Sequence, residues 1–235
     1  MAPTMLSPAS PVELFRYVVT YQKYPTTLLI CSPRADFTAS LRADVKSRMP
    51  QGQQLFDPED PEAAHYAEDD PHMALPLLQQ AVARHIRVLY VPTVAHLRAN
   101  LAVFSPADSL TPAPPNLPPP EKGKPPVLLV YGFLDLHRDS SEWSAQGIGG
   151  SAAVLVEAAS RTGYRPVLVE PKGAGGHESF GAVLHDDAPV LSGSSRRHEG
   201  GWTGRTVEVR RVLGRWFRLQ EGRWDIQWPC EEGAV

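Results

Sequence analysis

VLLVYGFL, residues 127–134, is the stretch that decides the fold, because it is nearly all apolar. A run of this kind is expected at the centre of a parallel sheet, where helices cover both faces. The alanine-rich residues 144–162 then predict a long helix that ends at Gly163. Residues 167–170 (VLVE) predict the next strand. A strand, a helix and a second strand in this order indicate an α/β domain.

The N-terminal half of the chain shows the same rhythm. Residues 26–31 (TTLLIC) predict a strand, and apolar residues at every fourth position from Phe37 to Met49 predict an amphipathic helix after it. Residues 86–91 (IRVLYV) predict another strand, followed by a helix that runs to Phe104. The predicted fold class is therefore α/β, with a mostly parallel central sheet flanked by helices.

The pattern changes in the C-terminal part of the chain. Three alternating runs, 205–213, 215–219 and 223–228, are separated only by short turns that contain glycine. Alternation interrupted by such turns is typical of antiparallel strands. We therefore expect a C-terminal antiparallel hairpin extension of the sheet.

The length of 235 residues fits one globular domain, and we assign 1–235 to it. Within it, residues 51–71 mix acidic residues with glycine and proline, and residues 105–126 are dense in proline. Neither composition favours regular structure, so we expect an acidic loop and a proline-rich insertion, both flexible. The formal net charge of −3 neither favours nor excludes a nucleic-acid partner.

Cysteine usage and hydropathy bear on the cellular compartment. Cys31 and Cys230 lie far apart, which indicates neither a disulfide framework nor a cysteine zinc site and suits a reducing compartment. Residues 1–10 have no basic segment followed by an apolar one, and no run approaches the roughly 18 apolar residues of a membrane span. We expect neither secretion nor membrane insertion.

The motifs for nucleotide and metal chemistry are missing from the sequence. A P-loop requires G-x-x-x-x-G-K-[ST], and the glycines at 173–176 and the Gly-Lys pair at 123–124 do not satisfy this spacing. The eight histidines form no H-E-x-x-H motif, and we expect them on the surface or in loops. The prediction is no cofactor, no metal and no catalytic residue.

A few residues leave a catalytic alternative open. Ser151 lacks the G-x-S-x-G elbow and is better explained by helix packing. His137 and Asp139 follow the central strand, where open α/β sheets bind ligands, but we favour a structural loop role for both. An atypical hydrolase or ATPase that uses His137, Asp139 or Glu142 remains the enzymatic alternative.

Basic residues concentrate near the C-terminus and alternate with tryptophans. The arginines are Arg196, Arg197, Arg205, Arg210, Arg211, Arg215, Arg218 and Arg223, and the tryptophans are Trp202, Trp216 and Trp224. One interpretation is a surface that follows phosphates and stacks bases. The other is the solvated face of an antiparallel sheet whose tryptophans lie in the core. The sequence does not separate the two.

Three segments carry a resemblance to a known family. Residues 127–171 resemble the central part of a RecA-type recombinase paralogue of the Shu-complex kind, in which a long helix and another strand follow the apolar strand. Residues 86–104 (IRVLYVPTVAHLRANLAVF) are similar to the preceding strand and helix of the SWIM-protein-associated family, and residues 204–219 resemble its C-terminal hairpin. The resemblance implies a RecA-like fold.

The resemblance also implies what the chain does. The Walker B aspartate position falls on Tyr131 or Gly132, neither of which can hold magnesium, so no ATPase activity is implied. The implied protein is a nuclear, non-catalytic subunit that binds a SWIM-domain zinc protein or another paralogue. It also binds single-stranded or branched DNA and promotes recombinase filament assembly in homologous recombination repair. The implied alternative is a RecA-like structural subunit of an Elongator-type tRNA-modification assembly.

The resemblance implies DNA contacts from the C-terminal arginines and from the glycine-rich loop at 172–176, which resembles the family's DNA-contacting loop. The expected DNA-binding residues are Lys172, Arg196, Arg197, Arg205, Arg210, Arg211 and Arg215. The sheet edge or the N-terminal segment is expected to hold the partner protein.

Overall fold

The computed structural model describes residues 2–21, 24–48, 82–113, 125–138, 140–173, 179–191 and 205–224. Within these ranges six strands form one sheet in the order β3-β2-β4-β5-β1-β8, and every neighbouring pair is parallel. The strands are β1 (Thr4–Ala9), β2 (Thr26–Ile30), β3 (Ile86–Tyr90), β4 (Val127–Tyr131), β5 (Arg165–Pro171) and β8 (Arg218–Gln220). The predicted fold class is confirmed, and the arrangement is consistent with a RecA-like sheet.

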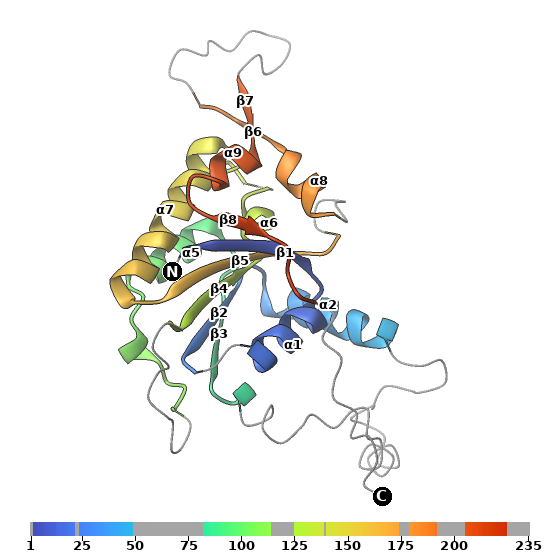
Figure 1. The fold of residues 1–235 in the computed structure, drawn as a ribbon, viewed down its shortest axis with the longest axis vertical. Helices are drawn as coiled ribbons and strands as arrows, with labels where there is room; N and C mark the ends of the chain where they lie inside the picture. The colour runs from blue at the N-terminus through green and yellow to red at the C-terminus, as the bar shows by residue number, and fades with distance from the viewer. Residues whose placement is uncertain are drawn as a thin grey trace, which may run out of the picture.

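Helices cover both faces of the sheet (Figure 1). They are α1 (Pro11–Tyr21), α2 (Arg34–Arg48), α5 (Val94–Ala102), α6 (Phe133–Arg138), α7 (Ala145–Thr162), α8 (Phe180–His185) and α9 (Val209–Leu213), with a short 3₁₀ turn at Pro106–Asp108. α1 and α2 pack together on one face, and α5 and α7 pack together on the other. Each pair encloses its own apolar core against the sheet.

Strand β4 confirms the prediction made from VLLVYGFL. All five of its residues are buried, and Leu128 and Val130 join the α5–α7 core while Leu129 and Tyr131 join the α1–α2 core. Successive side chains of a strand point to opposite faces, so apolar side chains cover both. The strand ends earlier than predicted, because Gly132 adopts a φ of 80° and the chain turns there into α6.

The long helix α7 has the predicted ends. Ser144 is its N-cap, and its hydroxyl accepts a hydrogen bond from the Gly147 amide at 3.0 Å. Gly163 closes it with a left-handed φ of 73°. The alanines of the buried side lie against the sheet, and the small residues of the other side leave a shallow surface, which is where the candidate site lies.

Strand β1 and helix α1 are the main elements that the sequence did not predict. All six residues of β1 are buried, between β5 and β8. Pro8 has no amide hydrogen to donate, and the pairing of β1 with β5 shifts register between Leu6 and Ala9. The expectation that the N-terminal segment holds a partner protein is not supported for residues 4–9, because the sheet encloses them.

The C-terminal elements differ from the prediction. An antiparallel pair is present, but it consists of β6 (Asp187–Pro189) and β7 (Thr206–Glu208) and forms a separate two-stranded sheet. Residues 209–213 form helix α9 instead of continuing the strand, because Val209, Val212 and Leu213 have the helical i, i+3, i+4 spacing and are buried. β8 joins β1 in parallel, so it does not form a hairpin.

Several expectations concern residues outside the described ranges. These are the acidic loop at 51–71, residues 114–124 of the proline-rich insertion at 105–126, and residues 225–228 of the last predicted strand. Among the helices of the described ranges, none is both long and apolar enough to span a membrane.

Candidate functional site

The turn from β1 to α1 has the strand–turn–helix arrangement in which P-loops occur. Here the turn is a single residue, Ser10, which caps the helix. The Ser10 hydroxyl accepts from the Glu13 amide at 3.3 Å, and the Glu13 carboxylate accepts from the Ser10 amide at 2.9 Å. This reciprocal pair is a capping box, so the Ser10 and Glu13 amides, which a phosphate would need, already donate to side chains of the protein.

A second carboxylate, that of Asp44, also accepts a hydrogen bond from an amide at the N-terminus of α1. Asp44 of α2 accepts from the Val12 amide at 2.9 Å and from Arg48 Nε at 2.8 Å. Burial would raise the pKa of Asp44, but hydrogen bonds from Arg48, Ser10 and Val12 outweigh it, so the pKa lies below its usual value. The protein's own anions therefore fill the positive end of this helix.

Lys172, one of the expected DNA contacts, belongs to this same network. Its ammonium lies 2.7 Å from Glu13 Oε1, and Arg48 lies 3.3 Å from the same oxygen. Burial would raise the pKa of Glu13, but the bonds from Lys172 and the Ser10 backbone outweigh it, so the pKa is lowered. Lys172 is thus paired with Glu13 at an exposed position, and it does not line the pocket that contains Arg211 and Arg215.

Tyr131, at which the resemblance places the Walker B aspartate, makes an internal contact. The Tyr131 hydroxyl donates to the Ala9 carbonyl at 2.9 Å, across the end of the sheet. Burial, followed by the nearby charge of Glu170, raises the pKa of this phenol. Glu170 itself is buried at the end of β5, where it accepts from the Leu134 amide at 3.0 Å. Gly132 continues the turn and provides no side chain.

His137 and Ser151 form a buried contact between α6 and α7. His137 Nδ1 lies 2.7 Å from the Phe133 carbonyl, which can only accept, so Nδ1 donates and Nε2 accepts from the Ser151 hydroxyl at 2.9 Å. Arg98 of α5 donates to the same hydroxyl at 2.9 Å and pairs with Glu142 at 2.6 Å. The network ties three helices together.

This geometry corrects the expectation for His137. The residue lies in a helix and is completely buried, not in a loop or on the surface. Burial lowers its pKa, so the ring is neutral at neutral pH. A serine–histidine contact is also found in nucleophilic catalysis, but here both side chains are fully enclosed. Asp139 lies outside the described residues. No sequence signal pointed to Arg98.

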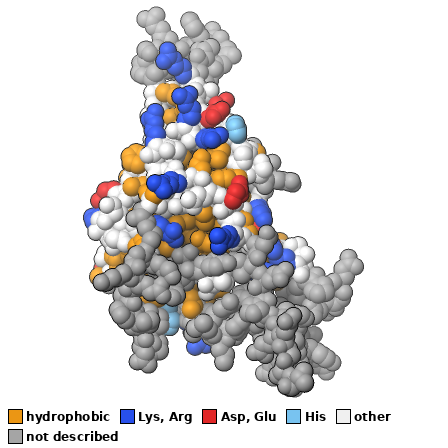
Figure 2. Space-filling view, viewed as in Figure 1, with side chains coloured by type: hydrophobic (Ala, Val, Ile, Leu, Met, Phe, Trp, Pro, Cys, Tyr) orange, Lys and Arg blue, Asp and Glu red, His pale blue; other side chains and the backbone are white. Residues whose placement is uncertain are grey.

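The C-terminal arginines of the described region are exposed and gather on one surface. Arg205 directly precedes β7, Arg210 and Arg211 lie on α9, and Arg215 lies in the turn after α9. Figure 2 shows Lys and Arg side chains collected over these elements. In the part of the chain that the structure describes, none of the four guanidinium groups makes a hydrogen bond or an ion pair. Arg196 and Arg197 lie outside it.

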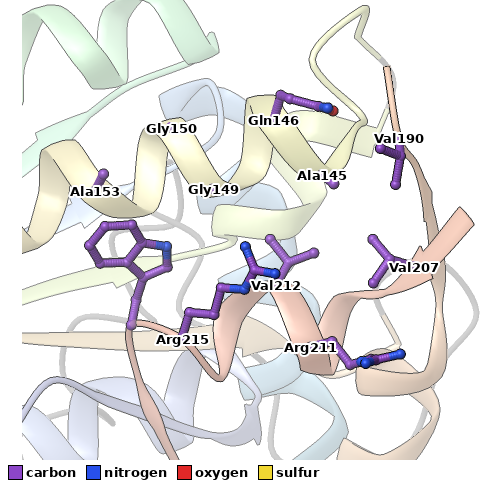
Figure 3. Close-up of a pocket in the computed structure, with 11 residues that line it drawn as sticks. Ala145, Gln146, Gly149, Gly150, Ala153, Val190, Val207, Arg211, Val212 and Arg215 are labelled. Carbon is purple, nitrogen blue, oxygen red and sulfur yellow. The ribbon is translucent and has the colours of Figure 1, made fainter. Parts of the chain in front are cut away.

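A groove of about 550 Å³ runs between α7 and α9, and we call it the α7–α9 groove. Figure 3 shows Arg215 extending toward the Gly149 side of α7, and Arg211 leaving α9 in another direction beside Val207. The groove is lined by Ala145, Gln146, Gly149, Gly150, Ala153, Val190, Val207, Arg211, Val212, Arg215 and Trp216. It therefore combines a floor of small residues with two cations and one indole.

The walls of the groove are held in place by hydrogen bonds. Gln146 of α7 donates to the Leu191 carbonyl at 2.9 Å and accepts from the Leu191 amide at 3.0 Å, which fixes the end of β6 to α7. Val212 of α9 lies beside Gly149. The site is therefore largely preformed, as ligand pockets usually are.

The antiparallel sheet that one interpretation of the arginines assumed is not found at Arg210 and Arg211, although the arginines are exposed as that interpretation expected. Arg210 and Arg211 lie on a helix, and Trp216 is 37% exposed. Trp224 packs edge-on against Tyr17 and donates to the Ser7 hydroxyl at 3.0 Å. Exposed arginines around a groove are thus what the structure shows.

Comparison with known proteins adds no family to this description. A scan against protein-family models and a search of curated proteins each found no match. The chain's function is therefore argued from its surfaces.

Proposed function

We propose that the chain is a non-catalytic subunit of the recombinase-paralogue kind that acts in the nucleus. It binds single-stranded or branched DNA in the α7–α9 groove and a partner protein, a SWIM-domain zinc protein or another paralogue, and thereby promotes recombinase filament assembly in homologous recombination repair. The observation that carries the proposal is the set of exposed arginines around the groove, whose guanidinium groups have no internal partner among the described residues.

The charges of these arginines are available to a ligand. A guanidinium that is not engaged in the fold can bind a phosphate without first breaking an internal ion pair. Contacts of this kind supply most of the sequence-independent affinity for nucleic acid, through release of counterions. Arg211 and Arg215 lie on the groove itself, so they are the contacts with the strongest geometric support.

The non-catalytic part of the proposal rests on the β1–α1 turn and on β4. Glu13 and Asp44 accept from the amides at the start of α1, which leaves no free cradle there for a nucleotide phosphate. Tyr131 stands at the end of β4 and bonds to Ala9. Both positions that a RecA-type ATPase would use are thus engaged in internal contacts.

Binding to a labelled oligo-dT tests the DNA part of the proposal. In a fluorescence-anisotropy salt titration, the Arg211→Glu, Arg215→Glu variant should bind more weakly, and the slope of log K against log salt should fall by about 1.4 for two lost phosphate contacts. The matched control is Arg34→Glu, Arg42→Glu, which changes the net charge equally through exposed arginines of α2.

The outcome decides between a local site and a general charge effect. Equal weakening by both variants would show that only net charge matters, and unchanged binding by the groove variant would refute the proposed site.

The proposed partner is tested by purifying the protein from cells. Co-purification of a zinc-binding SWIM protein or a recombinase paralogue would support the proposal. Sister RecA-like subunits of a ring that binds transfer RNA would overturn it in favour of an Elongator-type assembly.

A further inference from the structure

Trp216 lies at the junction of two hollows along α7. It lines the α7–α9 groove and also a second hollow of about 540 Å³, and Ala153 is likewise common to both. Its indole is 37% exposed, and among the exposed large apolar side chains of the described residues it is the aromatic one. A tryptophan exposed at a hollow is typical of binding surfaces, because burying it there is strongly favourable.

The backbone fixes the direction of this side chain. The amides of Trp216 and Phe217 both donate to the Leu213 carbonyl, at 2.9 and 2.8 Å, and the Gly214 amide donates to Arg210 at 2.9 Å. Phe217 is buried in the α5–α7 core, so its neighbour Trp216 is directed outward. These bonds hold the backbone at residue 216, and with it the direction of the Cα–Cβ bond, so binding requires little further ordering of the backbone.

The two hollows differ in their available charge. Arg211 and Arg215 line the first, and neither has a partner among the described residues. Arg161 lines the second, but its guanidinium bonds to Glu157 and to the carbonyls at the end of α5, including that of Leu101 at 3.1 Å. One side of Trp216 is thus cationic, and the other is lined by small and aliphatic side chains and by the ion pair of Arg161 with Glu157.

We propose that Trp216 is a base-stacking platform: an unpaired base lies against the indole, and Arg211 and Arg215 hold the adjoining phosphates. This inference rests on the proposed function and adds to it a preference for single-stranded over duplex DNA. Every base has a π-face that can stack on an aromatic ring, but in a duplex those faces are already covered by neighbouring pairs. An exposed indole beside two available cations therefore favours DNA whose bases are unpaired.

The test separates base stacking from phosphate binding by using two probes of equal charge, oligo-dT and an abasic oligomer of the same length. The wild-type protein should bind oligo-dT about five- to 150-fold more tightly than the abasic oligomer. Trp216→Ala should remove this difference, and Trp216→Phe should retain part of it. Leu110→Ala, which shortens a fully exposed apolar side chain elsewhere, should change nothing.

Fluorescence gives a second readout. Binding of oligo-dT should quench the tryptophan emission of the wild type more than that of Trp216→Phe, and the abasic oligomer should quench both equally. Thermal melting of each variant checks that the fold is intact, and Trp216→Phe serves if Trp216→Ala unfolds.

The failures of the two proposals are distinguishable. If Trp216→Ala binds oligo-dT like the wild type while Arg211→Glu, Arg215→Glu binds it weakly, the stacking platform is wrong and the DNA site stands. If neither variant changes binding, both are wrong. An acidic peptide that binds the groove more tightly than oligo-dT, with loss on Trp216→Ala, would also overturn the proposal by making the ligand a protein.

Discussion

The buried Glu170 predicts how the stability of the fold changes with pH, and it predicts the direction of that change. The side chain is buried at the end of β5, and its Oε1 accepts from the Leu134 amide at 3.0 Å. Burial is the largest influence and, with the nearby Asp135 carboxylate, it raises the pKa of Glu170 to about 8, against 4.5 for a free side chain. The change to make is Glu170→Gln, which removes the ionisation and keeps an oxygen that can accept from Leu134.

The size of the effect follows from the shift. A carboxyl whose pKa is raised on folding stabilises the folded state below its unfolded pKa, and this contribution is lost as the pH rises through the folded value. At about 1.4 kcal/mol for each unit of pKa, the wild type should lose roughly 5 kcal/mol from this group between pH 4.5 and pH 8 or above. The Glu170→Gln variant should not show this loss, so its free energy of unfolding should rise relative to that of the wild type as the pH increases.

Urea unfolding at pH 5.5, 7 and 9 measures this difference directly. The free energy of unfolding of Glu170→Gln should approach or exceed that of the wild type as the pH increases, with the largest gain at pH 9. Glu221→Gln, at an exposed position, is the control and should keep the wild-type pH dependence. Parallel pH profiles for the wild type and Glu170→Gln would refute the reasoning, because the carboxyl would then be charged in the native state.

Two further predictions concern the helix ends. Gly147→Ala should destabilise the fold by about 1–3 kcal/mol, because the added Cβ would lie 2.2 Å from the Glu142 carbonyl oxygen. Gly150→Ala is the control, because the nearest atom to its Cβ would be 4.0 Å away. Thermal melting compares the two variants, and equal melting temperatures would contradict the crowding argument. Asp44→Ala should cost about 1–2 kcal/mol at pH 7. Because the pKa of Asp44 is lowered on folding, this cost should disappear as the pH falls through that pKa, and denaturant unfolding at pH 7 and pH 3 would show whether it does.

Strands β2, β4 and β5 could be predicted because burial on both faces leaves a nearly continuous apolar run, whereas the edge strand β3, whose residues are only half-buried, was predicted from the run IRVLYV. β2, β3, β4 and β5 all lie within the ranges predicted from such runs or overlap them closely. Helix α7 was predicted with both ends, since serine before the helix and glycine after it have local roles in capping. These are cases in which the neighbouring residues alone determine the structure.

β1 and α9 could not be predicted, for two different reasons. β1 contains Pro8, which argues against a central strand unless the register shifts, and a shift is visible only in the pairing with β5. In α9 the apolar residues Val209, Val212 and Leu213 have the helical i, i+3, i+4 spacing, whereas the alternation that precedes them ends at Arg211. The helical pattern covers only five positions, and packing against α7 and α8 stabilises so short a helix.

The candidate site was predictable only in part. The sequence indicated that Arg211 and Arg215 would be exposed beside a tryptophan, and it left open which surface they formed. The groove itself depends on Gly149 and Ala153 of α7 facing α9, which is about 60 residues away along the chain. Lys172 was expected to be at the DNA surface, and its contact with Glu13 also depends on distant elements.

The placement of β1 has a consequence for synthesis on the ribosome. Thr4 pairs with Val167 on one side and with Arg218 on the other, so β1 is synthesised well before either of the strands that it pairs with. β2, β3 and β4 can pair much earlier in synthesis, because Thr26 pairs with Ile86 and with Val127, which are closer to it along the chain. Closing such distant pairs is slow, and we expect a nascent chain stopped before residue 165 to protect β2 from proteases while β1 remains open to them.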